Sequence, residues 1–99
     1  MYARLSTYQS GPIPPHVDLA EGSAPALRQV RQLPGFCGAY FLTDRASGRE
    51  IVLSLWKDEE SMWASEAKAA QIRAESAARE QQQIISVEHF EVGFAHLED

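Results

Sequence analysis

The 99-residue sequence contains a single cysteine and no long apolar run. Because Cys37 is alone, one chain can form neither an internal disulfide nor a zinc cluster built from cysteines. No apolar stretch approaches the roughly 20 residues that a membrane-spanning helix needs. The start MYARLSTYQSG has neither the basic nor the apolar segment of a secretory signal. We therefore expect a cytoplasmic protein without a membrane partner.

Basic side chains are scarce as well, since 14 acidic residues stand against 9 lysines and arginines and the formal net charge is -5. Such a chain repels phosphate backbones. No glycine-rich phosphate-binding motif is present. The stretch GFCGAYFL is similar to an RNA-recognition strand, but that motif begins with a basic residue and lies on a third strand, not a second. We expect no nucleic-acid partner.

The residues that are present describe an ordinary globular protein, with 44% hydrophobic and 23% charged side chains. The length predicts one domain over residues 1–99. A chain of this size is close to the limit at which a single core stabilises a fold only modestly, and association often adds the remaining stability. We therefore expect an oligomer.

The first third of the chain predicts a strand and then a helix. Tyr2–Gln9 suits a buried strand, and the prolines that follow end it. The segment Ser10–Gly22 is then a long loop, typical of a lid or a disordered tip. The pattern DLAE offers a helix start at Asp18, but a glycine and a proline soon interrupt it. We place the main helix from Ala24 to Leu33, with Ser23 as its cap.

The middle of the chain predicts a hairpin. Phe36–Asp44 is apolar on both sides of the expected strand, so both of its faces should be buried. Simple alternation groups Phe36, Tyr40 and Leu42 on one face and Cys37, Ala39 and Phe41 on the other. The loop DRASGRE allows Gly48 to adopt a left-handed conformation, and Ile51–Trp56 returns as the third strand.

The last third predicts a second helix and a fourth strand. Asp58 can cap the helix, whose first turn is acidic. One stripe of this helix is made of Trp63 followed by small residues, and we expect it to face the sheet. The stripe consists of Trp63, Ala67, Ala70, Ala74 and Ala77. Ile84–Ala95 is apolar on both sides and closes the chain as a strand.

These elements follow the order strand, helix, strand, strand, helix, strand. That order is typical of the α+β ferredoxin-like fold, with a four-stranded antiparallel sheet. Two helices cover one face of such a sheet. The other face is apolar here too, and an apolar face in water is an association site. We therefore expect a homodimer that meets through its sheet faces.

Four stretches together resemble the antibiotic biosynthesis monooxygenase-like (ABM) superfamily of dimeric α/β barrels: PGFCGAYFLTD, SGRE, LSLWKDEESMWAS and VEHFEV. The likeness extends from Tyr2 to about Ala95. The superfamily includes cofactor-independent oxygenases of aromatic polyketides, haem-degrading enzymes and proteins without an established activity. Its pocket lies between the sheet and the helices of each subunit. A tryptophan on the second helix lines that pocket and is matched by Trp63, whereas Trp56 matches a more widespread tryptophan at the end of strand three.

The resemblance also disfavours haem. The haem-degrading branch has an axial histidine on the second helix, about two and a half turns beyond the pocket tryptophan, and Ile72 and Arg73 stand in that region here. The chain's histidines, His16, His89 and His96, lie outside both predicted helices and share no metal-site spacing. We expect no metal or other cofactor, and for His89 we favour a hydrogen-bonded structural role.

An oxygenase without metal or flavin must take the electron for molecular oxygen from its substrate. Such chemistry requires an ionisable, phenol-like compound in a dry aromatic pocket, with a hydrogen-bonding group at its oxygen. The candidate pocket-lining residues are Trp63, Tyr40, Tyr8, Phe36 and His89. Each has a structural alternative: Trp63 would fill the core above the alanine stripe, and the tyrosines would be core or edge aromatics. Trp56 is interpreted as a structural anchor, and no catalytic base is singled out.

Two functions remain open. The first is a homodimeric, monooxygenase-like protein that accommodates a small aromatic or hydrophobic compound, with oxygen as co-substrate. The second is a non-catalytic ligand-binding or assembly module, which the alanine stripe favours because it would leave little space under the helix. Arg73 would bind an acidic substrate if it turned inward, but we favour an exposed side chain paired with Glu66 or Glu80.

Overall fold

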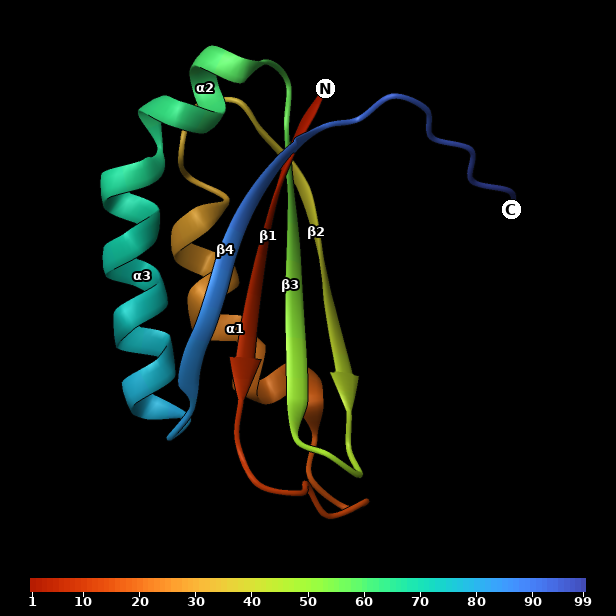
Figure 1. The fold of residues 1–99 in the computed structure, drawn as a ribbon, viewed down its shortest axis with the longest axis vertical. Helices are drawn as coiled ribbons and strands as arrows, with labels where there is room; N and C mark the ends of the chain where they lie inside the picture. Colours follow the sequence, from red (N-terminus) through yellow and green to blue (C-terminus); the bar gives the residue numbers. More distant parts are fainter.

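The computed structural model describes all 99 residues and contains one four-stranded sheet with its helices on one side (Figure 1). The elements are β1 (Tyr2–Gln9), α1 (Leu19–Val30), β2 (Phe36–Asp44), β3 (Arg49–Trp56), α2 (Glu59–Ala64), α3 (Glu66–Arg79) and β4 (Gln83–Glu91). The strand order is β2-β3-β1-β4, and all neighbours are antiparallel. The predicted α+β ferredoxin-like fold is confirmed. None of its helices is long and apolar enough to cross a bilayer.

Helix α1 begins earlier than predicted. Its cap is Asp18, whose carboxylate accepts hydrogen bonds from the backbone of Ala20 and Glu21. Pro25 lies inside the helix, where it removes one backbone hydrogen bond. The prediction of a start at Ala24 is wrong, because the Asp18 cap and the packing of α1 on α3 and β2 offset that loss.

The second predicted helix is divided in two at Ser65. The hydroxyl of Ser65 donates to the carbonyl oxygen of Met62 at 2.7 Å and accepts a hydrogen bond from Arg4 at 2.7 Å. Because this hydroxyl is engaged on both sides, it holds the junction of α2 and α3 against the sheet. Ser65 is itself buried.

The predicted alanine stripe is wrong for all but one of its members. Trp63, Ala67, Ala70 and Ala74 are exposed, and only Ala77 is buried. The buried side instead follows the spacing i, i+3, i+7 and i+10, and it consists of Met62, Ser65, Ala69 and Ile72. This side is buried against the sheet because it carries the long apolar side chains of the two helices.

A bulge at the start of β2 changes which way Phe36 points. Phe36 opposes Trp56 and Gly38 opposes Leu55, so one extra residue lies between them on β2. Opposed residues share a face, and Phe36 therefore turns to the helix side together with Phe41. The predicted grouping of Phe36 with the even-numbered residues of β2 is wrong, because alternation was assumed to be unbroken.

The loop after β1 is held against the β2–β3 hairpin. Gly48 has φ 78°, which confirms its predicted left-handed conformation, and a Cβ there would lie 2.1 Å from the carbonyl oxygen of Gly11. The backbone N–H of Ile13 donates to the carbonyl of Arg45 at 2.8 Å, and the Arg45 guanidinium donates to the carbonyl of Val17 at 2.9 Å. These contacts make the loop an ordered wall rather than a free tip.

Strand β4 ends sooner than predicted. Its last pair joins Glu91 to Tyr2, the first residue of β1, so beyond Glu91 there is no partner strand. The prediction of a strand up to Ala95 is wrong for this reason. The tail leaves the sheet and extends away from the helices (Figure 1), with Phe94 86% exposed.

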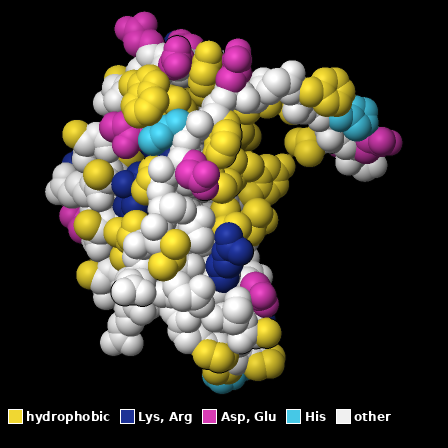
Figure 2. Space-filling model, in the orientation of Figure 1, with side chains coloured by type: hydrophobic (Ala, Val, Ile, Leu, Met, Phe, Trp, Pro, Cys, Tyr) yellow, Lys and Arg dark blue, Asp and Glu magenta, His cyan; other side chains and the backbone are white.

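The two faces of the sheet differ in polarity. Residues that face the helices include Arg4, Ser6, Tyr8, Glu50 and Ser54. The opposite, open face carries Leu5, Tyr40, Leu42, Ile51, Leu53 and Phe90. Figure 2 shows part of this open face as a broad hydrophobic surface.

Candidate functional site

A cavity of about 190 Å³ lies between the sheet and helices α1 and α3. Its apolar lining includes Ile13, Val17, Leu19, Phe41, Val52 and Ile72, and its polar lining includes Arg4, Tyr8, Glu50, Arg73, Glu80 and Gln82. A dry cavity of about 150 Å³ can hold benzene, so this space is sufficient for about one aromatic ring. The alternative with little space under the helix rested on an alanine stripe that faces the sheet, but α3 contributes Ala69, Ile72 and Arg73 to this lining instead.

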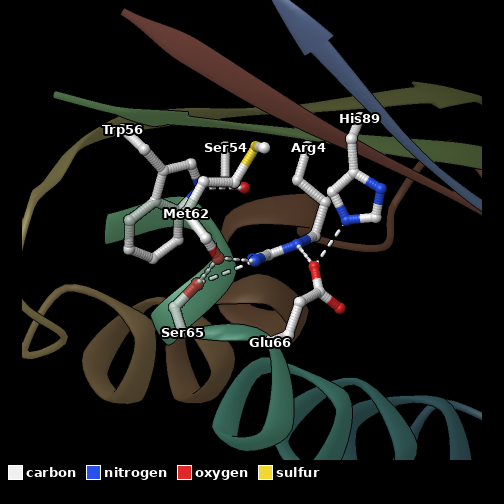
Figure 3. Close-up of polar contacts among 7 residues, drawn as sticks. All are labelled: Arg4, Ser54, Trp56, Met62, Ser65, Glu66 and His89. Carbon is white, nitrogen blue, oxygen red and sulfur yellow. Dashed lines mark hydrogen bonds and ion pairs between the residues drawn. The ribbon is translucent and has the colours of Figure 1, made fainter. Parts of the chain in front are cut away.

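Arg4, a buried arginine of β1, lines the cavity, and Figure 3 shows its polar contacts. Its Nε donates to Glu66 Oε1 at 2.7 Å, and its Nη2 donates to the Met62 carbonyl at 2.8 Å. The guanidinium carbon lies 5.2 Å from the ring centre of Trp56, a cation–π distance. The charge of Arg4 is therefore already paired within the protein.

Glu66 links this arginine to the outer edge of the sheet. The same oxygen that accepts from Arg4 is 2.5 Å from Nε2 of His89 (Figure 3). Burial alone would raise the pKa of Glu66, but hydrogen bonds from His89 and Arg4 and the charges of both outweigh it and lower the pKa. The structural, hydrogen-bonded role predicted for His89 matches this geometry.

Tyr8 and Arg73 also line the cavity. Tyr8 is 6% exposed, and burial raises the pKa of its phenol, with the nearby Arg73 opposing the increase. The phenol is therefore protonated at neutral pH and can donate a hydrogen bond. Arg73 forms no ion pair with either Glu66 or Glu80, because Glu66 binds Arg4 and Glu80 lies 3.8 Å from Arg79. The predicted pairing of Arg73 with one of these glutamates is wrong.

Glu50 lies opposite Tyr8 on the neighbouring strand. Burial raises the pKa of its carboxyl group, the nearby Glu80 adds to the increase, and a hydrogen bond of 3.1 Å from Gln82 opposes it. A carboxylate with a raised pKa is a stronger base than one at the surface. The cavity therefore contains one protonated donor and one carboxyl group tuned toward proton transfer.

The structure separates the predicted site residues. Tyr8 alone among them lines the cavity. Trp63 is 50% exposed and stacks on His89 with ring centres 4.2 Å apart, outside the cavity lining, so the alternative of Trp63 as a core residue is wrong. Phe36 packs edge-on against Trp56 at 5.6 Å, and Tyr40 lies on the open face, 47% exposed.

Trp56 is fully buried, and its indole N–H donates to Ser54 Oγ at 3.0 Å. This placement matches the structural anchor predicted for it. Sequence reasoning missed Arg4, Glu50 and Glu66 as site residues. A signal for Arg4 was present, since it is a charge in the centre of an otherwise buried strand.

Comparison with known proteins adds a curated match and several structural ones. No family model matches the sequence. The uncharacterized proteins MT2635 and Rv2558 of two Mycobacterium tuberculosis strains are 32% identical to it over 77 residues, which is 78% of this chain and 33% of theirs. The chain thus spans about a third of the length of these relatives.

A Deinococcus radiodurans protein described as a candidate antibiotic biosynthesis monooxygenase superposes with a TM-score of 0.64 and 16% identity, over 100% of this chain and 99% of that one. SnoaB of Streptomyces nogalater, a cofactor-independent oxygenase, gives 0.70 and 14% over 98% and 97%. The chain has the ABM-like fold. At these low sequence identities, the similarity shows that the backbone folds are alike.

The ABM-like fold raises the question of haem. A point mutant of MhuD, solved with two manganese protoporphyrin IX molecules in each active site, superposes with a TM-score of 0.60 and 19% identity over 99% of this chain and 100% of that one. No histidine, cysteine or methionine lines the cavity here, and the raised pKa of Tyr8 disfavours a tyrosinate ligand. The cavity residues do not fit haem, and no group of three metal-binding side chains occurs elsewhere.

Proposed function

We propose that this protein binds a small aromatic or hydrophobic compound in the cavity between sheet and helices and oxidises it with molecular oxygen, without a cofactor. The observation that supports this most is the partly open space of about 190 Å³, in which the protonated phenol of Tyr8 and the half-buried carboxyl group of Glu50 lie among apolar side chains. The likeness to SnoaB, a cofactor-independent oxygenase, adds support for the reaction class.

The chemistry that this cavity could support starts with a substrate whose acidic CH2 group can lose a proton. Glu50 accepts that proton, and the substrate anion transfers one electron to oxygen. The two radicals combine to form a carbon–oxygen bond. The peroxide O–O bond then breaks, so that one oxygen stays on carbon as a carbonyl and the other leaves as water with both substrate hydrogens. Tyr8 donates a hydrogen bond to the oxygen on which negative charge develops.

A non-catalytic binding module is the second candidate. It is favoured by the position of Trp63 and His89, the aromatic pair expected in the pocket, because both lie outside the cavity lining. This candidate retains the ligand and the cavity but removes the oxidation step.

The two candidates differ in oxygen consumption. Single-ring phenols that carry an acidic CH2 group would be titrated calorimetrically without oxygen and then under air at an oxygen electrode. Ala26→Phe fills the cavity lining and should abolish binding and oxygen uptake, whereas Ala70→Phe, on the exposed side of α3, should change neither. Binding without oxygen uptake would support the module. Absence of binding would refute both.

We also propose that the open sheet face joins a second copy of the chain. The face is apolar over three strands, and its members Leu5, Leu42, Ile51 and Leu53 have no helix above them. A typical interface buries about 800 Å² per partner. A face-to-face homodimer removes this apolar surface from water.

A further inference from the structure

We propose that Arg73 is the anion-recognition residue of the cavity, and that the ligand is a monoanionic, single-ring aromatic compound whose carboxylate or phenolate oxygen binds the guanidinium. This proposal rests on the proposed ligand-binding function and names its substrate class. It depends on the difference between two arginines that line the same space.

Arg4 and Arg73 are the basic side chains in the cavity lining. Arg4 is 3% exposed and donates to a carboxylate, a carbonyl and a hydroxyl. Arg73 is half-buried and has no carboxylate within ion-pair distance. A guanidinium that lines a partly buried cavity and forms no ion pair keeps its N–H groups available for a charge-assisted hydrogen bond to a ligand anion.

The neighbours of Arg73 limit the ligand further. Tyr8 lies close by and can donate a second hydrogen bond to the same anionic oxygen. Glu50, Glu80 and Asp18 also line the cavity and would repel additional negative charge. A single negative charge is therefore favoured over a dianion such as a phosphate monoester. The cavity volume of about 190 Å³ sets the size at about one ring.

Calorimetric titration of the intact chain at pH 7 with 4-hydroxybenzoate and its neutral isostere 4-hydroxybenzamide tests this. We expect the benzoate to bind more tightly. Arg73→Gln should weaken benzoate binding about tenfold or more while changing amide binding less than about twofold. Arg73→Lys should restore part of the loss. Arg79→Gln removes an arginine from the same helix outside the cavity and is the matched control.

Unchanged amide binding also shows that the variant is folded. Equal losses for benzoate and amide in Arg73→Gln, or an equal effect of Arg79→Gln, would overturn the role of Arg73 while leaving the binding function intact. Tighter binding of phenyl phosphate than of the benzoate would overturn the preference for a monoanion. If neither benzoate nor amide bound the unmodified protein, both the proposed function and this inference would fail.

Discussion

In an ordinary two-layer protein the sheet face under the helices is apolar and the open face is polar. In this protein the two faces are reversed. The face under the helices contains Arg4, Ser6 and Glu50, whereas the face without helices contains Leu5 and Leu53. Polar groups under a cover must be hydrogen-bonded to be tolerated, and no buried side-chain nitrogen or oxygen lacks a partner here. This difference agrees with the two proposals made above, a ligand site on the covered face and a partner surface on the open face.

The largest expected effect comes from placing a charge on each face. Phe90→Asp lies on the open face and should give a folded monomer, because the charge would enter the proposed twofold interface twice, at about 3–5 kcal/mol for each unpaired buried charge. Phe41→Asp lies under the helices and should unfold the chain itself. Light scattering measures the mass, and circular dichroism measures the fold.

Ala70→Asp provides the control for charge alone, because Ala70 is exposed on α3. It should leave both mass and melting temperature unchanged. An unmodified protein that is monomeric at micromolar concentration would contradict the role assigned to the open face.

The next effect concerns the ion pair that holds the covered face to α3. Glu66→Gln keeps the shape of the side chain but removes the negative charge that Arg4 and His89 share. We expect the free energy of unfolding to fall by roughly 2–3 kcal/mol, since Arg4 is buried and loses its counterion. Chemical denaturation measures this loss.

Glu80→Gln is the matched control, because Glu80 and Arg79 form a looser and half-exposed pair at 3.8 Å. Its cost should stay below about 1 kcal/mol. Similar losses of unfolding free energy in the two variants would show that the Arg4 network stabilises the fold no more than a half-exposed ion pair does.

The pH dependence of stability should separate two carboxyl groups on the covered side. The pKa of Glu66 is lowered in the folded protein, so its stabilising contribution is complete above the ordinary value of 4.5 and is lost as pH falls through the lowered pKa. The pKa of Glu50 is raised by burial, so its ionisation destabilises the fold as pH rises above 4.5.

Glu66→Gln should therefore flatten the loss of melting temperature at acidic pH, whereas Glu50→Gln should raise the melting temperature at neutral pH and lose that advantage on acidification. Thermal melts from pH 3 to 8 would reveal the two trends. If the melting temperature at neutral pH changed in the same direction in both variants, the opposite environments of the two carboxyl groups would be contradicted.

The smallest effect is expected at Trp63. Since its ring is half-exposed and stacks on His89 outside the cavity, Trp63→Phe should cost less than about 1 kcal/mol and change ligand affinity less than twofold. Tyr8→Phe, which removes a hydroxyl inside the cavity, should weaken ligand binding more. A stronger effect of Trp63→Phe on affinity would place this indole in the ligand's path.

The fold could be predicted from the sequence because turn signals and apolar strands are local properties. Gly48 is an example, since only a left-handed residue fits that hairpin. The faces of the elements were harder to predict. One extra residue in β2 turned Phe36 over, and Asp18 started a helix despite Pro25, because long-range pairing and packing decide both.

The site was predicted only in part for the same reason. Tyr8 could be named because an aromatic on a buried strand is visible in the sequence. Arg4 and Glu66 are 62 positions apart, and their pairing follows from the docking of α3 on β1 rather than from any local spacing. Nothing in the sequence around Glu50 shows that its carboxyl group is half-buried.

The contact between Gly48 and Gly11 has a use in engineering. A side chain at position 48 would collide with the loop backbone, and that loop supplies Ile13 and Val17 to the wall of the cavity. Because Gly48 also has φ 78°, any other residue there would strain the turn and force the loop backbone to shift. A library that varies the cavity lining should therefore keep Gly48 unchanged, since its replacement would disturb the wall at a cost in stability.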